Sequence, residues 1–135
     1  MSSEARARIL LVDDEPNIIK VMGKRLTAEG FEVDMAMDGE DALTKVRASH
    51  PDLIILDVML PKLSGIEVCE TLKCAPQYRD IPIVIVTAKA QARDRQQGFA
   101  CGADAYLTKP FHAATLLEEI RRLLAQGVSD TPQQE

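Results

Sequence analysis

The chain has 135 residues, of which 46% are hydrophobic, and this is enough to bury the core of one globular domain. The formal net charge of -5 argues against nucleic-acid binding by this domain alone, and no apolar run approaches the length of a membrane span. The first eight residues are polar and hold no apolar signal segment, so we expect a cytoplasmic protein. Cys69 and Cys101 lie among apolar neighbours and are expected to be small buried hydrophobes.

Strand and helix patterns alternate five times along the chain. Short, largely β-branched apolar runs predict strands over residues 8–12, 31–36, 52–57, 81–87 and 104–107. Helical spacing predicts helices over residues 15–29, from Asp38-Gly39 to His50-Pro51, from Ser64 to Lys73, over 90–101 and over 111–126. We expect residues 1–126 to form the domain and the polar residues 127–135 to form a flexible tail.

Several helix boundaries carry recognisable residues. Pro16 suits the first turn of the first helix, and Gly30 suits its C-terminal stop. Ser64 followed by Glu67 is a capping-box pattern at the start of the third helix. The helix over 90–101 has few large apolar residues, so we expect it to be the least anchored to the core and the most mobile.

Polar groups follow four of the predicted strands. Asp13 and Asp14 come after the first, Asp57 after the third, Thr87 closes the fourth, and Lys109 follows the fifth. The ends of parallel strands open into one crevice, where open α/β folds bind ligands. Any single aspartate here could be a helix cap or a solvated strand-end acid, but the combination predicts one site.

Adjacent carboxylates require a cation, because at roughly 4–5 Å they repel each other by about 1–4 kcal/mol. All-oxygen ligation suits Mg²⁺, with Mn²⁺ possible. A metal-bound carboxylate can attack phosphorus to give an aspartyl phosphate, whose peripheral oxygens then need stabilisation. Asp57, the Lys109 amine and the Thr87 hydroxyl suit this chemistry, and the small Ala88 leaves room for a phosphoryl group.

Four stretches in this order and spacing resemble the receiver domain of two-component response regulators, over residues 8–126. They are Val12-Asp13-Asp14-Glu15-Pro16, Asp57-Val58-Met59-Leu60-Pro61 with Gly65, Val86-Thr87-Ala88, and Gly102-Ala103-Asp104-Ala105-Tyr106-Leu107-Thr108-Lys109-Pro110-Phe111. The resemblance implies a doubly wound α/β fold. This is a (βα)5 three-layer sandwich with five parallel strands in the flavodoxin-like order 2-1-3-4-5.

The resemblance also implies a phosphoacceptor and a metal site. Asp57 would accept a phosphoryl group from a histidine of a sensor kinase or phosphotransfer protein. Asp14, Asp57 and the Met59 carbonyl would ligate Mg²⁺, with Asp13 acting through water. Lys109, Thr87 and Ala88 would then hold the phosphoryl group, and the domain would be no enzyme beyond its own phosphorylation and dephosphorylation.

A switch is implied as well. Phosphorylation would draw Thr87 inward and let Tyr106 rotate from exposed to buried. The face of the fourth helix, fifth strand and fifth helix would then change its contact with a downstream protein. The Lys109–Pro110 peptide is usually cis in this family. We expect no direct contact with nucleic acid or membrane, and a monomer or weak dimer.

Two other classes fail at named positions. A phosphatase of the haloacid-dehalogenase type needs a second aspartate where Met59 stands. A flavodoxin-like flavin binder needs a Ser/Thr/Gly-rich loop where Asp13-Asp14-Glu15 stands, and these acids would repel a phosphate that came without a metal.

The chain is expected to be a stand-alone regulator, with a receiver excised from a longer transcription factor or signalling enzyme as the alternative. Winged-helix transcription regulators usually pair an acid and an arginine across a dimer. Ala105 and Glu119 occupy those two positions, which argues against that dimer.

Overall fold

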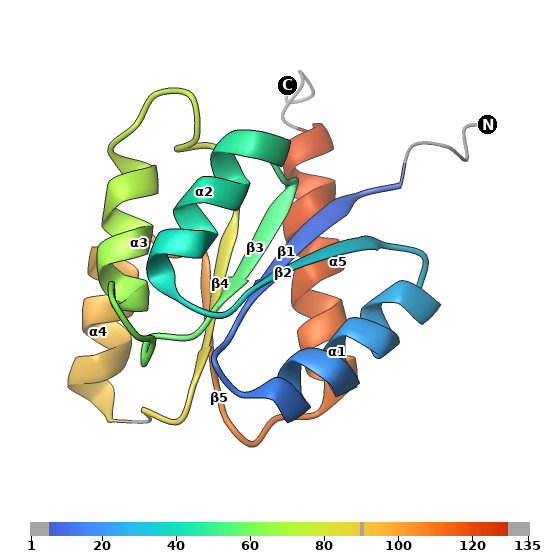
Figure 1. Cartoon of the computed structure of the whole chain (residues 1–135), viewed down its shortest axis with the longest axis horizontal. Coiled ribbons are helices and arrows are strands. Elements are labelled where there is room, and N and C mark those ends of the chain that lie inside the picture. Colours follow the sequence, from blue (N-terminus) through green and yellow to red (C-terminus); the bar gives the residue numbers. More distant parts are fainter. Residues whose placement is uncertain (1–5, 90, 130–135) are drawn as a thin grey trace.

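The computed structural model describes residues 6–89 and 91–129, with the side chains of 127–129 left aside. Strands and helices alternate throughout these residues (Figure 1). The strands are β1 (Arg8–Val12), β2 (Glu32–Ala36), β3 (Leu53–Leu56), β4 (Ile83–Thr87) and β5 (Ala105–Thr108). The helices are α1 (Pro16–Ala28), α2 (Gly39–Ser49), α3 (Gly65–Lys73), α4 (Ala92–Ala100) and α5 (Ala113–Ser129).

All pairings in the sheet are parallel, and the strand order is β2-β1-β3-β4-β5. This confirms the expected flavodoxin-like order. Val12 pairs with Leu56, and Leu56 pairs with Ile85, so the carboxyl ends of the three central strands lie side by side. The residues that follow these strands therefore share one edge of the sheet.

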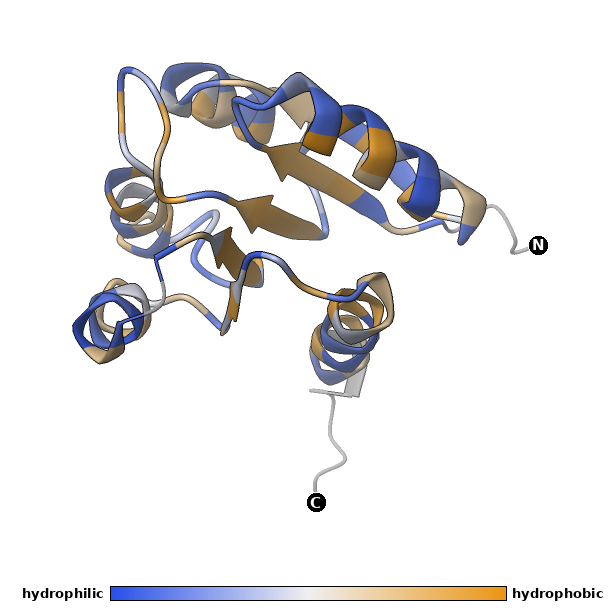
Figure 2. Cartoon of the chain, turned by 90° about the horizontal axis from the view of Figure 1, so that it is seen from below, coloured by the Kyte–Doolittle hydropathy of each residue, from blue (hydrophilic) through white to orange (hydrophobic). Residues whose placement is uncertain are grey.

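Two hydrophobic cores lie on opposite faces of the sheet. One joins inward residues of α2 and α3, such as Val46 and Leu72, to Leu10 and Ile54 of the strands. The other joins α1 and α5 to the alternate strand residues, and its members include Ile9, Leu26 and Leu116. Figure 2 shows the consequence, with hydrophobic strands enclosed by helices that combine hydrophobic and hydrophilic residues. Cover on both faces explains the continuous apolar runs of β1, β3 and β4.

Most helix boundaries follow the expected residues. Pro16 is the first residue of α1, and Gly30, with a φ of 99°, follows the C-cap residue Glu29. At α3 the capping box is complete: the Ser64 Oγ accepts from the Glu67 N–H at 3.2 Å, and the Glu67 Oε1 accepts from the Ser64 N–H at 3.0 Å. These contacts satisfy two otherwise unpaired donors at the helix start.

The end of α5 differs from the expectation. The helix continues through Ser129, so the predicted boundary at residue 126 is three residues too early. The three added residues include Gly127, which weakens a helix by about 1 kcal/mol relative to alanine and does not end this one. The rest of the expected tail, residues 130–135, lies outside the described residues, as does Ala90 before α4. Within the described ranges, no helix is long and apolar enough to cross a membrane.

Candidate functional site

Backbone pairing places two aspartates next to each other at the carboxyl edge of the sheet. Asp13 directly follows β1 and Asp57 directly follows β3. The Asp13 N–H donates to the Ala36 carbonyl, and the Asp57 N–H donates to the Val12 carbonyl, each at 3.1 Å. These contacts continue the ladders of the sheet by one residue, so the positions of the two carboxylates are fixed by the fold.

The carboxylate cluster consists of Asp13, Asp14 and Asp57. One oxygen from each residue lies within 4.8 Å of the other two. Asp13 and Asp57 are buried, with 3% and 6% of their surface exposed, whereas Asp14 is exposed. Three convergent oxygens with one side open to solvent suit a hard divalent cation that keeps several waters. The cluster therefore fits Mg²⁺, as the sequence predicted.

Lys109 bridges the two buried carboxylates. Its Nζ lies 2.7 Å from Asp13 Oδ2 and 2.9 Å from Asp57 Oδ2, and it reaches Glu15 Oε1 at 3.7 Å. Burial of the amine lowers the pKa of Lys109, but the hydrogen bonds and negative charges of Asp13 and Asp57 outweigh this and leave the pKa above its ordinary value. The group is thus a firmly protonated cation at the centre of the site.

Backbone donors fix the second oxygen of each buried carboxylate. The Met59 N–H donates to Asp57 Oδ1 at 3.0 Å, and the Glu15 N–H donates to Asp13 Oδ1 at 2.9 Å. The start of α3 packs closely against the backbone of Asp57 and Val58 because Gly65 has no side chain. A Cβ at Gly65 would lie 2.1 Å from the Asp57 carbonyl oxygen.

Thr87 ends β4 beside these groups and is completely buried. Its carbonyl accepts from the Lys109 N–H at 2.8 Å, but its hydroxyl has no hydrogen-bond partner among the described residues. An unpaired buried hydroxyl costs about 1–3 kcal/mol, and such a cost in a native fold calls for a functional explanation. Ala88, the next residue, is exposed.

Tyr106 lies in β5 and is buried, with 4% of its surface exposed. Its hydroxyl donates to the Lys89 carbonyl at 2.7 Å, two residues after Thr87. Burial raises the pKa of Tyr106, the charge of Asp94 raises it further, and Arg95 opposes the shift. The family resemblance implies an exposed and a buried position for the Tyr106 side chain, and the structure shows the buried position.

The structure brings together the predicted residues Asp13, Asp14, Asp57 and Lys109, and it places Thr87 at the same edge of the sheet. The Lys109–Pro110 peptide is cis, as expected. The Met59 backbone touches Asp57, although the contact is made by its N–H and its side chain is exposed. Sequence reasoning missed Glu15 as a third partner of Lys109. The run of three acids before Pro16 was the available indication.

The chain is thus a doubly wound α/β protein of the kind that binds ligands at the carboxyl ends of its strands, and here that edge holds three carboxylates and a partly buried lysine. Comparison with known protein families identifies the class of protein more closely. The response regulator receiver domain model matches residues 9–121. A probable transcriptional regulator of Cyanophora paradoxa, ycf27, is 44% identical over 126 residues, or 93% of this chain and 52% of that protein. The chain spans about half the length of the curated relatives it matches.

Solved structures agree with the family match. A CheY-like response regulator receiver domain protein of Methanospirillum hungatei JF-1 gives a TM-score of 0.87 at 29% identity, covering 93% of this chain and 99% of that one. The receiver domain of a sensor histidine kinase of Pseudomonas aeruginosa PAO1, solved with a magnesium ion in its active site cleft, gives 0.83 at 31% identity. That match covers 90% of this chain and 99% of the other. The chain belongs to the receiver domain family of two-component response regulators.

Proposed function

We propose that this receiver domain accepts a phosphoryl group on Asp57 from a phosphohistidine of a sensor kinase or phosphotransfer protein. One observation carries the proposal. Lys109 is held between Asp57 and Asp13 at 2.9 and 2.7 Å, at the sheet edge where the buried Thr87 hydroxyl lacks a described partner. A nucleophile, a cation and a free hydroxyl at one edge of the sheet are the groups that transfer to a carboxylate requires.

The transfer is a displacement at phosphorus. An Asp57 carboxylate oxygen forms the new P–O bond, the P–N bond to the donor imidazole breaks, and its electron pair returns to the ring nitrogen. Lys109 offers its ammonium to one phosphoryl oxygen, and Thr87 offers its hydroxyl to another. Each of these donors gains a partner as charge develops on the phosphoryl group, so both favour the phosphorylated state.

Mg²⁺ is the proposed cofactor, with Mn²⁺ as a substitute. The oxygens of Asp13, Asp14 and Asp57 would hold the ion, Asp13 through a water, and the family resemblance adds the Met59 carbonyl to this set. Bound there, the ion would neutralise negative charge between the carboxylates and the incoming phosphoryl group. The magnesium in the receiver domain from Pseudomonas aeruginosa supports this choice for the acidic crevice.

The output is proposed to pass through α4, β5 and α5. When the Thr87 hydroxyl turns toward the phosphoryl group, space beside it favours the buried Tyr106, and the surface of these elements changes for a downstream protein. We propose a gene-regulatory output, and the support is that several curated relatives are transcriptional regulators. We propose that the domain itself turns over no external substrate and acts in the cytoplasm.

The direct test is incubation with acetyl phosphate, with and without Mg²⁺, followed by intact mass measurement. We expect a gain of one phosphoryl group that depends on Mg²⁺ and is absent in Asp57→Asn. A folded sample that binds Mg²⁺ and gains no phosphoryl group would contradict the proposal. Tyr106→Ala tests the division of roles, because it should weaken coupling to a partner and leave uptake by Asp57 intact.

A further inference from the structure

Gly98 is the only buried residue of α4, and it lies against the ring of Tyr106. A Cβ built at Gly98 would lie 2.6 Å from Cδ2 and 2.7 Å from Cε2 of that ring, and 3.4 Å from Cδ1 of Ile85. Real Cβ atoms essentially never come this close to another heavy atom. The ring of Tyr106 therefore occupies the space in which any other residue at position 98 would place its side chain.

The ring is held on its other sides by groups at and before α4. Its hydroxyl donates to the Lys89 carbonyl at 2.7 Å. The Arg95 guanidinium carbon lies 5.2 Å from the ring centroid, within the range of a cation–π contact, and the Phe99 ring centroid lies at 6.3 Å. We call this space, bounded by Lys89, Arg95, Gly98 and Phe99, the Tyr106 slot.

We propose that Gly98 is the positioning residue that keeps the Tyr106 slot open, so that Tyr106 can be buried only while position 98 carries no side chain. This inference rests on the proposed role of Tyr106 in signalling and adds the element that permits its buried state. With a larger residue at 98, either the ring leaves the slot or α4 moves away from β5. Each outcome would change the α4 surface without touching Asp57.

Two physical considerations support this assignment over an ordinary helix glycine. Glycine weakens a helix interior relative to alanine, and α4 already has few apolar anchors, so helix formation alone would favour alanine at position 98. The obstacle is also rigid. The atoms that a Cβ at Gly98 would meet belong to the phenol ring itself and not to the end of a flexible side chain. The ring has only two torsions by which it could move aside, and its hydroxyl is held by the Lys89 carbonyl.

The test compares Gly98→Ala with Gly23→Ala, the same substitution in α1. At Gly23 a Cβ would meet Met35 at 3.4 Å or more, which is ordinary contact. Tyrosine-selective ¹³C labelling gives the ring signals of the two tyrosines, and Tyr78 serves as the internal reference. We expect Gly98→Ala to shift the Tyr106 ring signals toward those of an exposed tyrosine and Gly23→Ala to leave them unchanged.

A thermal double-mutant cycle identifies the ring as the obstacle. In a Tyr106→Ala background the clash is removed, so Gly98→Ala should raise the melting temperature by about 2–5 °C through helix propensity. In the wild-type background it should lower the melting temperature or prevent folding. The same rise in both backgrounds, with Tyr106 signals unchanged, would overturn the proposal.

Acetyl phosphate uptake separates this inference from the proposed function. Gly98→Ala should take up one phosphoryl group at a rate within about twofold of the wild type, because the substitution leaves the carboxylate site untouched. If uptake is absent in the wild type, the proposed function fails, while the ring signals still report on the slot. If Gly98→Ala takes up phosphate normally and its Tyr106 ring signals are unchanged, the inference about Gly98 is refuted and the proposed function is unaffected.

Discussion

At the scale of single residues, Lys109 is the group on which the unphosphorylated site depends. Its side chain is 15% exposed, and it is the described cation in contact with both buried carboxylates. Removing one partner from a buried ion pair leaves uncompensated charge and usually costs about 3–5 kcal/mol. Solvent near the exposed Asp14 reduces the cost of the uncompensated charge. We therefore expect Lys109→Gln to lower the free energy of unfolding by about 2–4 kcal/mol at neutral pH.

The pH dependence of this loss follows from the pKa of Lys109. Because the pKa is raised in the folded state, the stabilisation is fully present below the ordinary value of 10.5 and is lost as the pH rises through the folded-state pKa. The stability gap between wild type and Lys109→Gln should therefore narrow above that value. Urea unfolding at a series of pH values from neutral to alkaline measures this difference in the free energy of unfolding, and Lys24→Gln, at an exposed lysine, is the control. A gap that stays constant with pH would show that the ammonium charge is not responsible.

Met59 and Lys89 set a second expectation at this scale, for the lifetime of the phosphorylated state. Each is exposed and lies two residues after a site residue, Asp57 or Thr87. We hypothesise that their long side chains shield the phosphoryl group from a hydrolytic water. Met59→Asn combined with Lys89→Glu should then lose phosphate several-fold faster, followed by intact mass after removal of acetyl phosphate. Decay at the wild-type rate would refute the shielding.

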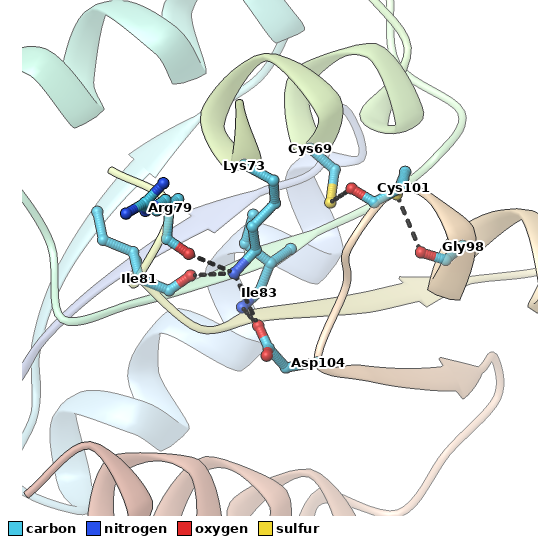
Figure 3. A network of polar contacts seen from close by, with 8 residues as sticks. All are labelled: Cys69, Lys73, Arg79, Ile81, Ile83, Gly98, Cys101 and Asp104. Atoms are coloured by element: carbon cyan, nitrogen blue, oxygen red, sulfur yellow. Dashed lines mark hydrogen bonds and ion pairs between the residues drawn. The ribbon is translucent and has the colours of Figure 1, made fainter. Parts of the chain in front are cut away.

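At the scale of elements, Lys73, the last residue of α3, ties that helix to the segment before β4 and to Asp104, which directly precedes β5 (Figure 3). Its Nζ donates to the Arg79 carbonyl at 3.1 Å, the Ile81 carbonyl at 2.9 Å and Asp104 Oδ2 at 3.1 Å. The same Asp104 oxygen accepts from the Ile83 N–H at 2.8 Å. One ammonium and one carboxylate thus join the end of α3, the start of β4 and the residue that precedes β5.

Replacing Lys73 should test whether this junction is structural. Lys73→Met keeps the aliphatic length and removes the three donors, and we expect a loss of about 1–3 kcal/mol because two carbonyls and a carboxylate lose a partner. Folded protein should still accept phosphate at the wild-type rate. Chemical denaturation and acetyl phosphate uptake measure the two effects, with the exposed Lys20→Met as control. Unchanged stability would mean that solvent replaces the lysine at no cost.

The elements themselves could largely be predicted from the sequence, because their causes are local. The capping box at Ser64, the proline at the start of α1 and the buried apolar strands each act within a few residues. The end of α5 was placed too early because the polar C-terminal segment was interpreted as a tail, although a glycine and polar residues can continue a helix. Cys69 and Cys101 were correctly predicted to be buried. Their thiols donate to the Cys101 and Gly98 carbonyls, at 3.5 and 2.9 Å (Figure 3).

At the scale of the whole molecule, the sequence predicted that the site residues gather at one edge of the sheet, but it did not predict which side chains contact each other. The carboxyl ends of parallel strands meet at one edge, and the expected order 2-1-3-4-5 makes the first, third and fourth strands neighbours, so Asp13, Asp57 and Thr87 were expected at the same edge. The reach of Lys109 across β4 and β3 to Asp13, and the fit of Tyr106 against Gly98, depend on strand register and helix placement between distant segments. Such contacts leave no local pattern in the sequence.

Metal binding offers a test of the assembled molecule. A ligand that binds the folded chain alone stabilises it by about 2.7 kcal/mol at a concentration one hundred times its Kd. We expect Mg²⁺ to raise the urea concentration at the unfolding midpoint of the wild type, and the rise should grow with the ratio of Mg²⁺ concentration to Kd. Asp14→Asn removes one of the three carboxylates and should largely abolish the shift. An equal shift in Asp14→Asn would indicate a general salt effect.

The reach of Lys109 has a consequence for the chain as it is made. The acids of the site are synthesised first, and their lysine follows 52 residues after Asp57. Until the fifth strand has emerged from the ribosome, a nascent chain carries the acceptor without the cation that compensates it. A chain that stops before Lys109 would therefore keep the proposed acceptor Asp57 and lack the ammonium that contacts it. The complete site forms only once the segment after β5 has been made.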